Sequence, residues 1–146
     1  MFDDTEFRYE TELQVRVRDL DHMGHVNNAM YATYMEQART DYFGDVLNVG
    51  LDDLEMAVVS SHIEFKRQVR YGGGLTVQVR VPQLGRTSFP LEYRFLDDGE
   101  AAATARTVQV SLDSENDTAC PLPDLWRMSI VEHEDLSEED GTVAES

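Results

Sequence analysis

Two different spacings of apolar residues divide this 146-residue chain, and together they leave few folds open. Beyond residue 55, apolar residues recur mostly at every second position, which is typical of strands that bury one face. The clearest example is the segment 75–81, in which Leu75, Val77 and Val79 alternate with polar residues. This part of the chain is expected to build a sheet.

One earlier stretch has a helical spacing instead. Between Asn28 and Gly44, apolar residues recur at intervals of three and four, and most charged residues fall elsewhere around the helix. The residues on its apolar side are Tyr31, Tyr34, Met35, Ala38 and Tyr42. Because Asn27 and Asn28 are good N-cap residues, the helix is expected to begin directly after them. Its end is expected between Gly44 and Gly50.

The remaining elements give an α+β fold. Strands are expected at residues 12–18, 56–66, 75–81, 89–95 and 101–112. The sequence Asp97-Asp98-Gly99 predicts a hairpin, and Pro90 predicts an edge or a bulge in the fourth strand. One long helix can bury its apolar side on a curved antiparallel sheet of this kind. We expect the strands around Val79 and Val110 to leave an open edge, which a homodimer would cover.

The overall charge excludes several classes of partner. The 29 acidic and 12 basic residues give a formal charge of -17, which disfavours non-specific binding to nucleic acid or to anionic membranes. A lone Cys120 excludes an internal disulfide and a cysteine-rich zinc module. No apolar run approaches membrane-spanning length, and the N-terminus lacks the features of a signal peptide. A cytoplasmic protein is therefore expected.

The charge is concentrated at the two ends of the chain. Residues 1–12 contain five acids and one Arg, and residues 132–146 contain seven acids and no base. We expect residues 1–130 to form one domain and residues 131–146 to form an acidic, disordered tail. Lys66 is the one Lys beside 11 Arg, a bias that favours adaptation to molar salt, where charge repulsion is screened. The alternative is an ordinary domain with acidic ends.

The densest group of functional side chains lies just before the helix, in the segment 19–28. Asp21 can act as a general base or a nucleophile, and backbone N–H groups at the helix start, near Asn27 and Asn28, can stabilise an oxyanion. This arrangement suits attack on a carbonyl. The alternative is that Asp19 and Asp21 only cap turns and that the Asn pair only caps the helix.

The same segment also offers oxygen and nitrogen ligands for zinc or iron, from Asp19, Asp21, His22 and His25. Side chains this close along a turn often point apart, and the HExxH metal-binding motif is absent. Metal binding is therefore the minority alternative, and neither a metal nor another cofactor is expected.

The pattern DxDxxGHVNNxxYxxYxExAR, from Asp19 to Arg39, resembles the 4-hydroxybenzoyl-CoA thioesterase family of hotdog-fold acyl-CoA thioesterases. Segments 61–67, 69–72, 84–89 and 105–110 also agree with this family, so the resemblance covers about residues 10–127. It implies a five-stranded antiparallel sheet wrapped around one long helix, in a dimer or tetramer with active sites at the subunit interface. It also implies hydrolysis of an acyl-CoA to a free acid and CoA.

The resemblance implies roles for individual residues. Asp21 matches the catalytic carboxylate, which attacks the thioester carbonyl or activates water, and Asp19 matches a supporting acid. Asn28 matches the position whose backbone N–H polarises the carbonyl. His25 is the nearest match to a histidine that assists in some members. Glu36 matches an acid of the helix, for which pairing with Arg39 is the simpler role.

A CoA substrate also requires a positively charged binding surface, because CoA carries several phosphate charges. A local basic patch must offset the acidic background, and Arg binds phosphate bidentately. The bases that match positions bordering the family's site are Lys66, Arg67, Arg70, Arg86 and Arg106. Tyr31, with its neighbours Tyr34, Met35 and Phe65, can line an acyl pocket or belong to the core.

Two observations limit the resemblance. Many family members have Tyr-Gly-Asp where this chain has Tyr71-Gly72-Gly73, so a loop carboxylate is missing. The acidic ends have no counterpart. Two other functions stay open on the same fold: a non-catalytic protein that binds acyl-CoA or an acyl carrier, and a hydratase or dehydratase.

Overall fold

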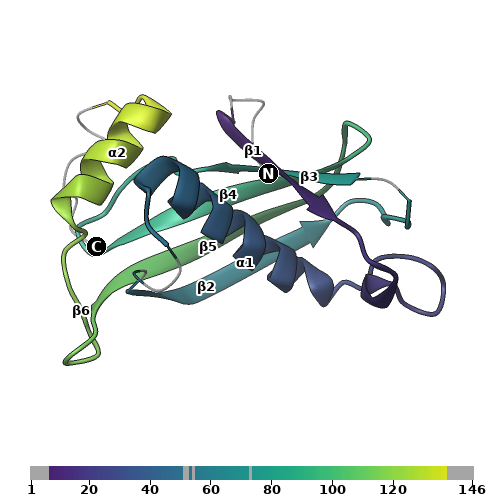
Figure 1. Cartoon of the computed structure of the whole chain (residues 1–146), viewed down its shortest axis with the longest axis horizontal. Coiled ribbons are helices and arrows are strands. Elements are labelled where there is room, and N and C mark those ends of the chain that lie inside the picture. Colours follow the sequence, from purple (N-terminus) through teal and green to yellow (C-terminus); the bar gives the residue numbers. More distant parts are fainter. Residues whose placement is uncertain (1–6, 51–52, 54, 73, 138–146) are drawn as a thin grey trace.

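The computed structural model describes residues 7–50, 53, 55–72 and 74–137. Its elements in chain order are β1 (Tyr9–Gln14), the 3-10 turn η1 (Val17–Asp19), α1 (Met30–Tyr42), the π-helical turn η2 (Phe43–Leu47), β2 (Met56–Phe65), β3 (Gly74–Arg80), β4 (Ser88–Asp97), β5 (Glu100–Asp113), β6 (Thr118–Ala119) and α2 (Asp124–Glu134). The strand order is β1-β3-β4-β5-β2, every pairing is antiparallel, and the short β6 pairs with β5. Figure 1 shows this sheet curving around α1, which confirms the predicted hotdog architecture.

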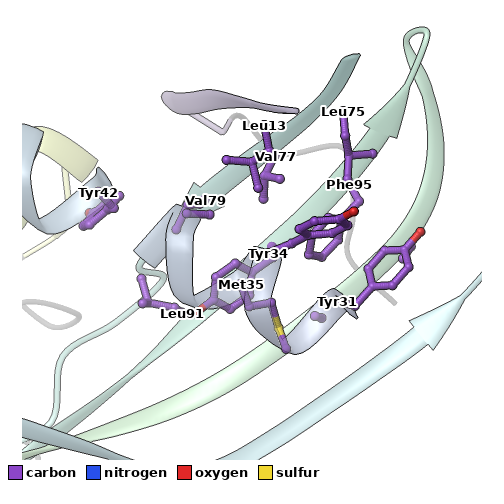
Figure 2. Close-up of a cluster of buried hydrophobic side chains, with 14 of the residues drawn as sticks. Leu13, Tyr31, Tyr34, Met35, Tyr42, Leu75, Val77, Val79, Leu91 and Phe95 are labelled. Carbon is purple, nitrogen blue, oxygen red and sulfur yellow. The ribbon is translucent and has the colours of Figure 1, made fainter. Parts of the chain in front are cut away.

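Helix α1 buries the side that its sequence predicts. Its buried residues are Tyr31, Tyr34, Met35, Ala38 and Tyr42. They lie among apolar side chains of β1, β3 and β4, including Leu13, Leu75, Val77, Val79, Leu91 and Phe95 (Figure 2). Burying one such side chain contributes about 1.5–3 kcal/mol, so this layer is the main support of the fold.

The predicted ends of α1 and of the last hairpin are also confirmed. The helix continues into η2, and Asn48, with φ of 56°, closes it in the left-handed conformation. Between β4 and β5, Asp98 and Gly99 have φ of 53° and 81°. Positive φ at both central residues is the type I′ geometry that a two-residue hairpin prefers, which explains the Asp-Gly pair.

The first strand was predicted three residues too late. β1 spans Tyr9–Gln14, not 12–18, because the Asp19 carboxylate accepts the Arg16 N–H (3.0 Å) and turns the chain into η1. Val15 remains buried although it lies outside the strand, whereas Val17, in η1, is 68% exposed, so the alternation of buried and exposed residues ends where the turn begins.

The predicted open edges were wrong as well. β3, which contains Val79, and β5, which contains Val110, each have a neighbour on both sides, and the edges are β1 and β2. Pro90 behaves as expected for an edge position. β3 pairs only with residues 92–97 of β4, so Pro90 has a neighbouring strand on one side alone.

Helix α2 extends into the segment where a tail was predicted to begin. Residues 131–134 belong to this helix, whereas 138–146 lie outside the described residues. The Glu134 carboxylate anchors the helix, because it accepts the Tyr42 hydroxyl (2.5 Å) and the Val81 N–H (2.9 Å). His133, which falls in the segment predicted to be a tail, lies against the Tyr42 ring, with centroids 5.7 Å apart. In the described part of the chain, no helix is long and apolar enough to cross a membrane.

Candidate active site

The segment 19–28 forms a closed loop between η1 and α1, at the end of α1 that lies away from α2 (Figure 1). Asp21 N–H donates to the His25 carbonyl (2.7 Å), and Asn27 N–H donates to the Asp19 carbonyl (2.8 Å). Gly24 makes the turn with φ of 81°, a conformation that glycine adopts at no steric cost. The backbone ladder therefore fixes the shape of the loop.

A second set of backbone contacts joins this loop to the segment before β3. Val26 N–H donates to the Val69 carbonyl (2.7 Å), and His25 forms an isolated antiparallel bridge with Arg70. The loop thus lies beside the end of the sheet that carries the β4–β5 hairpin and the C-terminus of β2. The His25 side chain is buried there, so the residue supports the loop in addition to any chemical role.

Asp21 is half-buried and presents one unused oxygen. Its Oδ1 accepts the N–H groups of Met23 (2.9 Å) and His25 (3.1 Å). These hydrogen bonds, that of His25 first, lower the pKa of the carboxyl below its usual value, so it is ionised at neutral pH. Within the described residues, Oδ2 accepts no hydrogen bond. Asp21 therefore caps a turn with one oxygen and keeps the other available for chemistry.

Asn28 supplies the matching donor. Asn27 closes the turn before α1, since its Oδ1 accepts the Ala29 N–H (3.0 Å) and its carbonyl accepts the Met30 N–H (2.8 Å). The exposed Asn28 donates its own N–H to no acceptor in the part of the chain that the structure describes. This N–H lies at the positive end of the α1 dipole, where a developing negative charge is stabilised.

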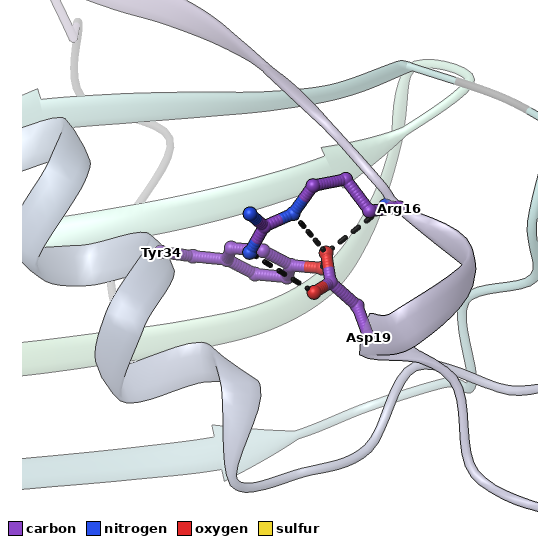
Figure 3. A network of polar contacts seen from close by, with 3 residues as sticks. All are labelled: Arg16, Asp19 and Tyr34. Atoms are coloured by element: carbon purple, nitrogen blue, oxygen red, sulfur yellow. Dashed lines mark hydrogen bonds and ion pairs between the residues drawn. The ribbon is translucent and has the colours of Figure 1, made fainter.

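Asp19 has a different environment, shown in Figure 3. It is fully buried, and its carboxylate accepts the Tyr34 hydroxyl (2.9 Å) and the N–H and guanidinium of Arg16 (3.0 and 3.2 Å). Burial acts to raise the pKa of Asp19, but the hydrogen bonds from Arg16 and Tyr34 outweigh it and lower the pKa. Both oxygens are engaged, so Asp19 supports the loop and is not free to react.

The metal alternative has little support from this geometry. The Asp19 carboxylate faces Arg16 and Tyr34, whereas that of Asp21 faces the turn, so the two do not converge. Among the described residues, no group of three or more His, Cys, Asp or Glu side chains could hold a metal ion.

The predicted basic residues divide between two ends of the sheet. Lys66, Arg67 and Arg70 follow β2, at the end near the loop, and Arg67 forms ion pairs with Asp97 (3.2 Å) and Glu100. Arg86 precedes β4 at the opposite end, about 30 Å away for a ten-residue strand. One chain therefore does not bring Arg86 to the Asp21 loop.

Arg106 lies on the other face of the sheet. Its neighbours Ala105 and Thr107 are buried toward α1, so the exposed Arg106 side chain points away from the helix. Its pairing partners in the flanking strands are Glu92 and His62. It is therefore not part of the loop end either.

Two further predicted residues have clear structural contacts. Tyr31 is 2% exposed and packs edge-to-face on Phe65 and Phe95, with centroids 5.1 and 5.0 Å apart. Burial, with a contribution from Asp97, raises the pKa of Tyr31 to about 12. Tyr31 is thus a core residue at the loop end of α1. Glu36 is exposed one turn further along the helix.

Arg39 does not pair with Glu36 as predicted. Its Nη1 donates to the Tyr93 hydroxyl (3.1 Å), which lies 2.7 Å from the Thr107 hydroxyl. Thr107 in turn contacts Gln109, whose amide donates to the Phe89 carbonyl (3.0 Å). Sequence reasoning missed this buried polar chain. Its signal is that the polar residues Thr107 and Gln109 occupy the same face as Ala103 and Ala105.

Known proteins have the same architecture and a similar sequence. The sequence model of a family described as the thioesterase-like superfamily matches residues 15–139. A solved structure of a thioesterase from Thermus thermophilus, complexed with coenzyme A and Zn, is 34% identical, with a TM-score of 0.82, over 90% of this chain and 97% of that chain. A predicted thioesterase from Bacillus stearothermophilus is 23% identical, with a TM-score of 0.79, over 94% and 98%.

Two bacterial proteins are also similar in sequence over most of their length. The uncharacterised protein YsmA of Bacillus subtilis is 29% identical over 117 residues, which is 79% of this chain and 80% of that protein. A 1,4-dihydroxy-2-naphthoyl-CoA hydrolase of Synechococcus elongatus is 24% identical over 125 residues, which is 80% of this chain and 90% of that protein. With its curved antiparallel sheet around one long helix, the chain belongs to the thioesterase-like superfamily of hotdog proteins.

Proposed function

We propose that this protein hydrolyses an acyl-CoA thioester to a free carboxylic acid and CoA, as a member of the 4-hydroxybenzoyl-CoA thioesterase branch. The observation that carries the proposal is the pairing of an ionised Asp21, with one free oxygen, and the unused Asn28 N–H at the helix start. The Synechococcus relative is named as an acyl-CoA hydrolase, and the Thermus thioesterase was solved with coenzyme A.

The proposed reaction places the thioester carbonyl oxygen on the Asn28 N–H. Asp21 Oδ2 then attacks the carbonyl carbon, the C–S bond breaks, and the CoA thiolate leaves and takes up a proton. Water hydrolyses the resulting anhydride and releases the acid. In the other route, Asp21 removes a proton from the attacking water. The lowered pKa keeps the Asp21 carboxylate ionised, which both routes require, so the two routes stay open.

The same proposal includes a homodimer, formed through β2. This ten-residue edge strand exposes Val58, Val59 and Phe65, at 42%, 63% and 46%. A long apolar edge of this kind needs a covering strand. Two copies pairing antiparallel along β2 would bring the Met56 end of the partner beside the Phe65 end of this chain. The Met56 end also carries Arg86, so Arg86 of the partner subunit would approach the Asp21 loop and could bind CoA phosphate.

The test of the reaction is thiol release from short, long, branched and aromatic acyl-CoAs, measured in dilute buffer and in molar KCl. Turnover of at least one substrate is expected. Acyl-CoA binding with no thiol release by the wild-type protein would overturn the proposal in favour of a binding protein. Because the Lys deficit favours adaptation to salt, activity is expected to be higher in molar KCl, and equal activity in both buffers would contradict that part.

The dimer has its own test. Val59→Lys places a charge on the exposed β2 edge, so sedimentation should show monomers, and thiol release should fall because the partner's Arg86 is lost from the site. Glu12→Lys changes an exposed residue of the other edge strand and serves as the matched control. Equal dissociation of both variants, or a wild-type monomer, would contradict the β2 dimer.

A further inference from the structure

We infer that Tyr34 is a positioning residue: through the buried Asp19 carboxylate, its hydroxyl fixes the Asp21 loop relative to the start of α1. The inference rests on the proposed function for its kinetic consequence. The contact itself is a property of the structure, in which the Tyr34 Oη donates to Asp19 Oδ2 at 2.9 Å (Figure 3).

Asp19 connects both sides of the proposed site. Two residues after it, Asp21 carries the reactive carboxylate. The backbone carbonyl of Asp19 accepts the Asn27 N–H (2.8 Å). Asn27 directly precedes Asn28, whose N–H would bind the carbonyl oxygen of the substrate. Any displacement of Asp19 is therefore transmitted along the backbone to Asp21 and through one hydrogen bond to the position before Asn28.

Tyr34 closes this set of contacts into a ring. It lies six residues after Asn28 on α1, where its ring is buried against the sheet and its hydroxyl points to Asp19. Among the described residues, it is the one α1 side chain that bonds to Asp19. The other donor, Arg16, belongs to the chain before the loop and does not connect Asp19 to the helix.

The hydrogen bond between Tyr34 and Asp19 is expected to be strong, and its loss is expected to affect the rate of the reaction. A hydrogen bond to a buried carboxylate is stronger than one between neutral groups, because it stabilises a charge away from water. Attack on a carbonyl requires the nucleophile and the oxyanion donor to be placed within a fraction of an ångström. A small displacement of one relative to the other lowers the rate while leaving substrate contacts elsewhere intact.

The protein contains a matched control for this contact. Tyr42 lies eight residues further along the same helix, about 12 Å away, is equally buried, and donates its hydroxyl to the Glu134 carboxylate (2.5 Å). Tyr34→Phe and Tyr42→Phe therefore remove the same hydroxyl from two buried tyrosines, one bonded to the fully buried Asp19 and the other to the half-buried Glu134. They differ in which end of α1 they affect.

The first measurement is backbone amide hydrogen exchange, which needs no substrate. We expect Tyr34→Phe to accelerate exchange at Asp21, His25 and Asn27 by about tenfold, and Tyr42→Phe to leave these amides unchanged. Unchanged exchange in Tyr34→Phe, or the same acceleration in both variants, would overturn the inference. Because this result does not depend on turnover, it is separate from the fate of the proposed function.

The second measurement is thiol release at a temperature where both variants are fully folded by circular dichroism. We expect kcat of Tyr34→Phe to fall about tenfold with KM within a factor of two, and kcat of Tyr42→Phe to match the wild type. Equal losses in both variants, or a Tyr34→Phe effect confined to KM, would indicate a general structural role and overturn the inference.

A double variant tests whether Tyr34 acts through Asp19. Asp19→Asn alone should slow the reaction at least as much as Tyr34→Phe. If the two residues act through one contact, the combined Asp19→Asn and Tyr34→Phe protein should be no slower than Asp19→Asn within a factor of two. Multiplied effects would show that Tyr34 acts independently of Asp19. If Asp19→Asn does not fold, the paired tyrosine variants alone decide the question.

Discussion

The two ends of α1 contain the same kind of hydrogen bond but differ in what it supports. At each end a buried tyrosine hydroxyl donates to a carboxylate, Tyr34 to Asp19 and Tyr42 to Glu134. At the C-terminal end Glu134 also accepts the Val81 N–H, and the contacts join α2 to the sheet. At the N-terminal end, one oxygen of Asp21 and the Asn28 N–H have no hydrogen-bond partner among the described residues. The two ends therefore differ in whether polar groups lack a hydrogen-bond partner, and not in the residue types that they contain.

The largest expected effect is at the N-terminal end. Asp21→Asn keeps the shape of the side chain but removes its charge, so kcat/KM should fall about a thousandfold or more. Thiol release and urea unfolding measure the effect on rate and on stability. Glu134→Gln removes the same charge at the other end and should leave kcat unchanged. Turnover of Asp21→Asn near the wild-type level would show that the Asp21 carboxylate is not needed for the reaction.

At the C-terminal end the expected loss is in stability. Glu134→Ala leaves the Tyr42 hydroxyl and the Val81 N–H without their acceptor, which should lower the free energy of unfolding by about 2 kcal/mol. Urea unfolding measures this loss, and kcat of the folded fraction should not change. A large fall in kcat at unchanged stability would show that the two ends are not separate in function.

A smaller effect is expected where Asn27 closes the turn before α1. Asn27→Ala removes the acceptor for the Ala29 N–H and should cost about 1 kcal/mol in unfolding free energy. Asn27→Asp retains a carboxylate oxygen for the same N–H and should keep most of the stability. Urea unfolding of the two variants is the measurement, and equal losses would show that the side chain does not act as an acceptor.

The smallest expected effect is a change in the free energy of unfolding at low pH. The folded state lowers the pKa of Asp19 below its usual unfolded value of about 3.9. Its contribution to stability is thus fully present above pH ~4 and is lost as the pH falls through the folded pKa. The difference in unfolding free energy between wild type and Asp19→Asn should be constant from pH 5 to 7 and should shrink toward pH 3. A difference that grows in acid would contradict the assignment.

Features that depend on neighbours in sequence were predicted well. The buried side of α1, its start after Asn28 and its end before Gly50 follow from helical spacing and from residues that start or stop helices. The β4–β5 hairpin follows from Asp98 and Gly99, whose positive φ suits the turn. The helix ends and the hairpin rest on interactions within a few residues, and the side of α1 that faces the sheet is set by the spacing of its own apolar residues.

Features that depend on distant contacts were predicted poorly. The strands of Val79 and Val110 are interior because β1 and β2, far away in sequence, pair with them. His133 falls in the segment predicted to be a tail, but it contacts the aromatic rings of Tyr9 and Tyr42. Arg39 was expected to bond to Glu36, but Tyr93 accepts its hydrogen bond. In each case a partner more than 50 residues away, or a strand pairing, competed with the local alternative.

The α+β class, the buried side of the helix and the position of the loop proposed as the active site, residues 19–28, could all be predicted from the amino-acid sequence, because apolar periodicity and turn chemistry act locally. Which polar groups of that loop have hydrogen-bond partners depends on the folded chain. Folding buries Asp19 against Tyr34 and separates Arg86 from the loop by the length of a strand. In the part of the chain that the structure describes, it leaves one oxygen of Asp21 and the Asn28 N–H without a hydrogen-bond partner. These outcomes depend on which polar groups find partners across the fold, and spacing along the chain does not contain that information.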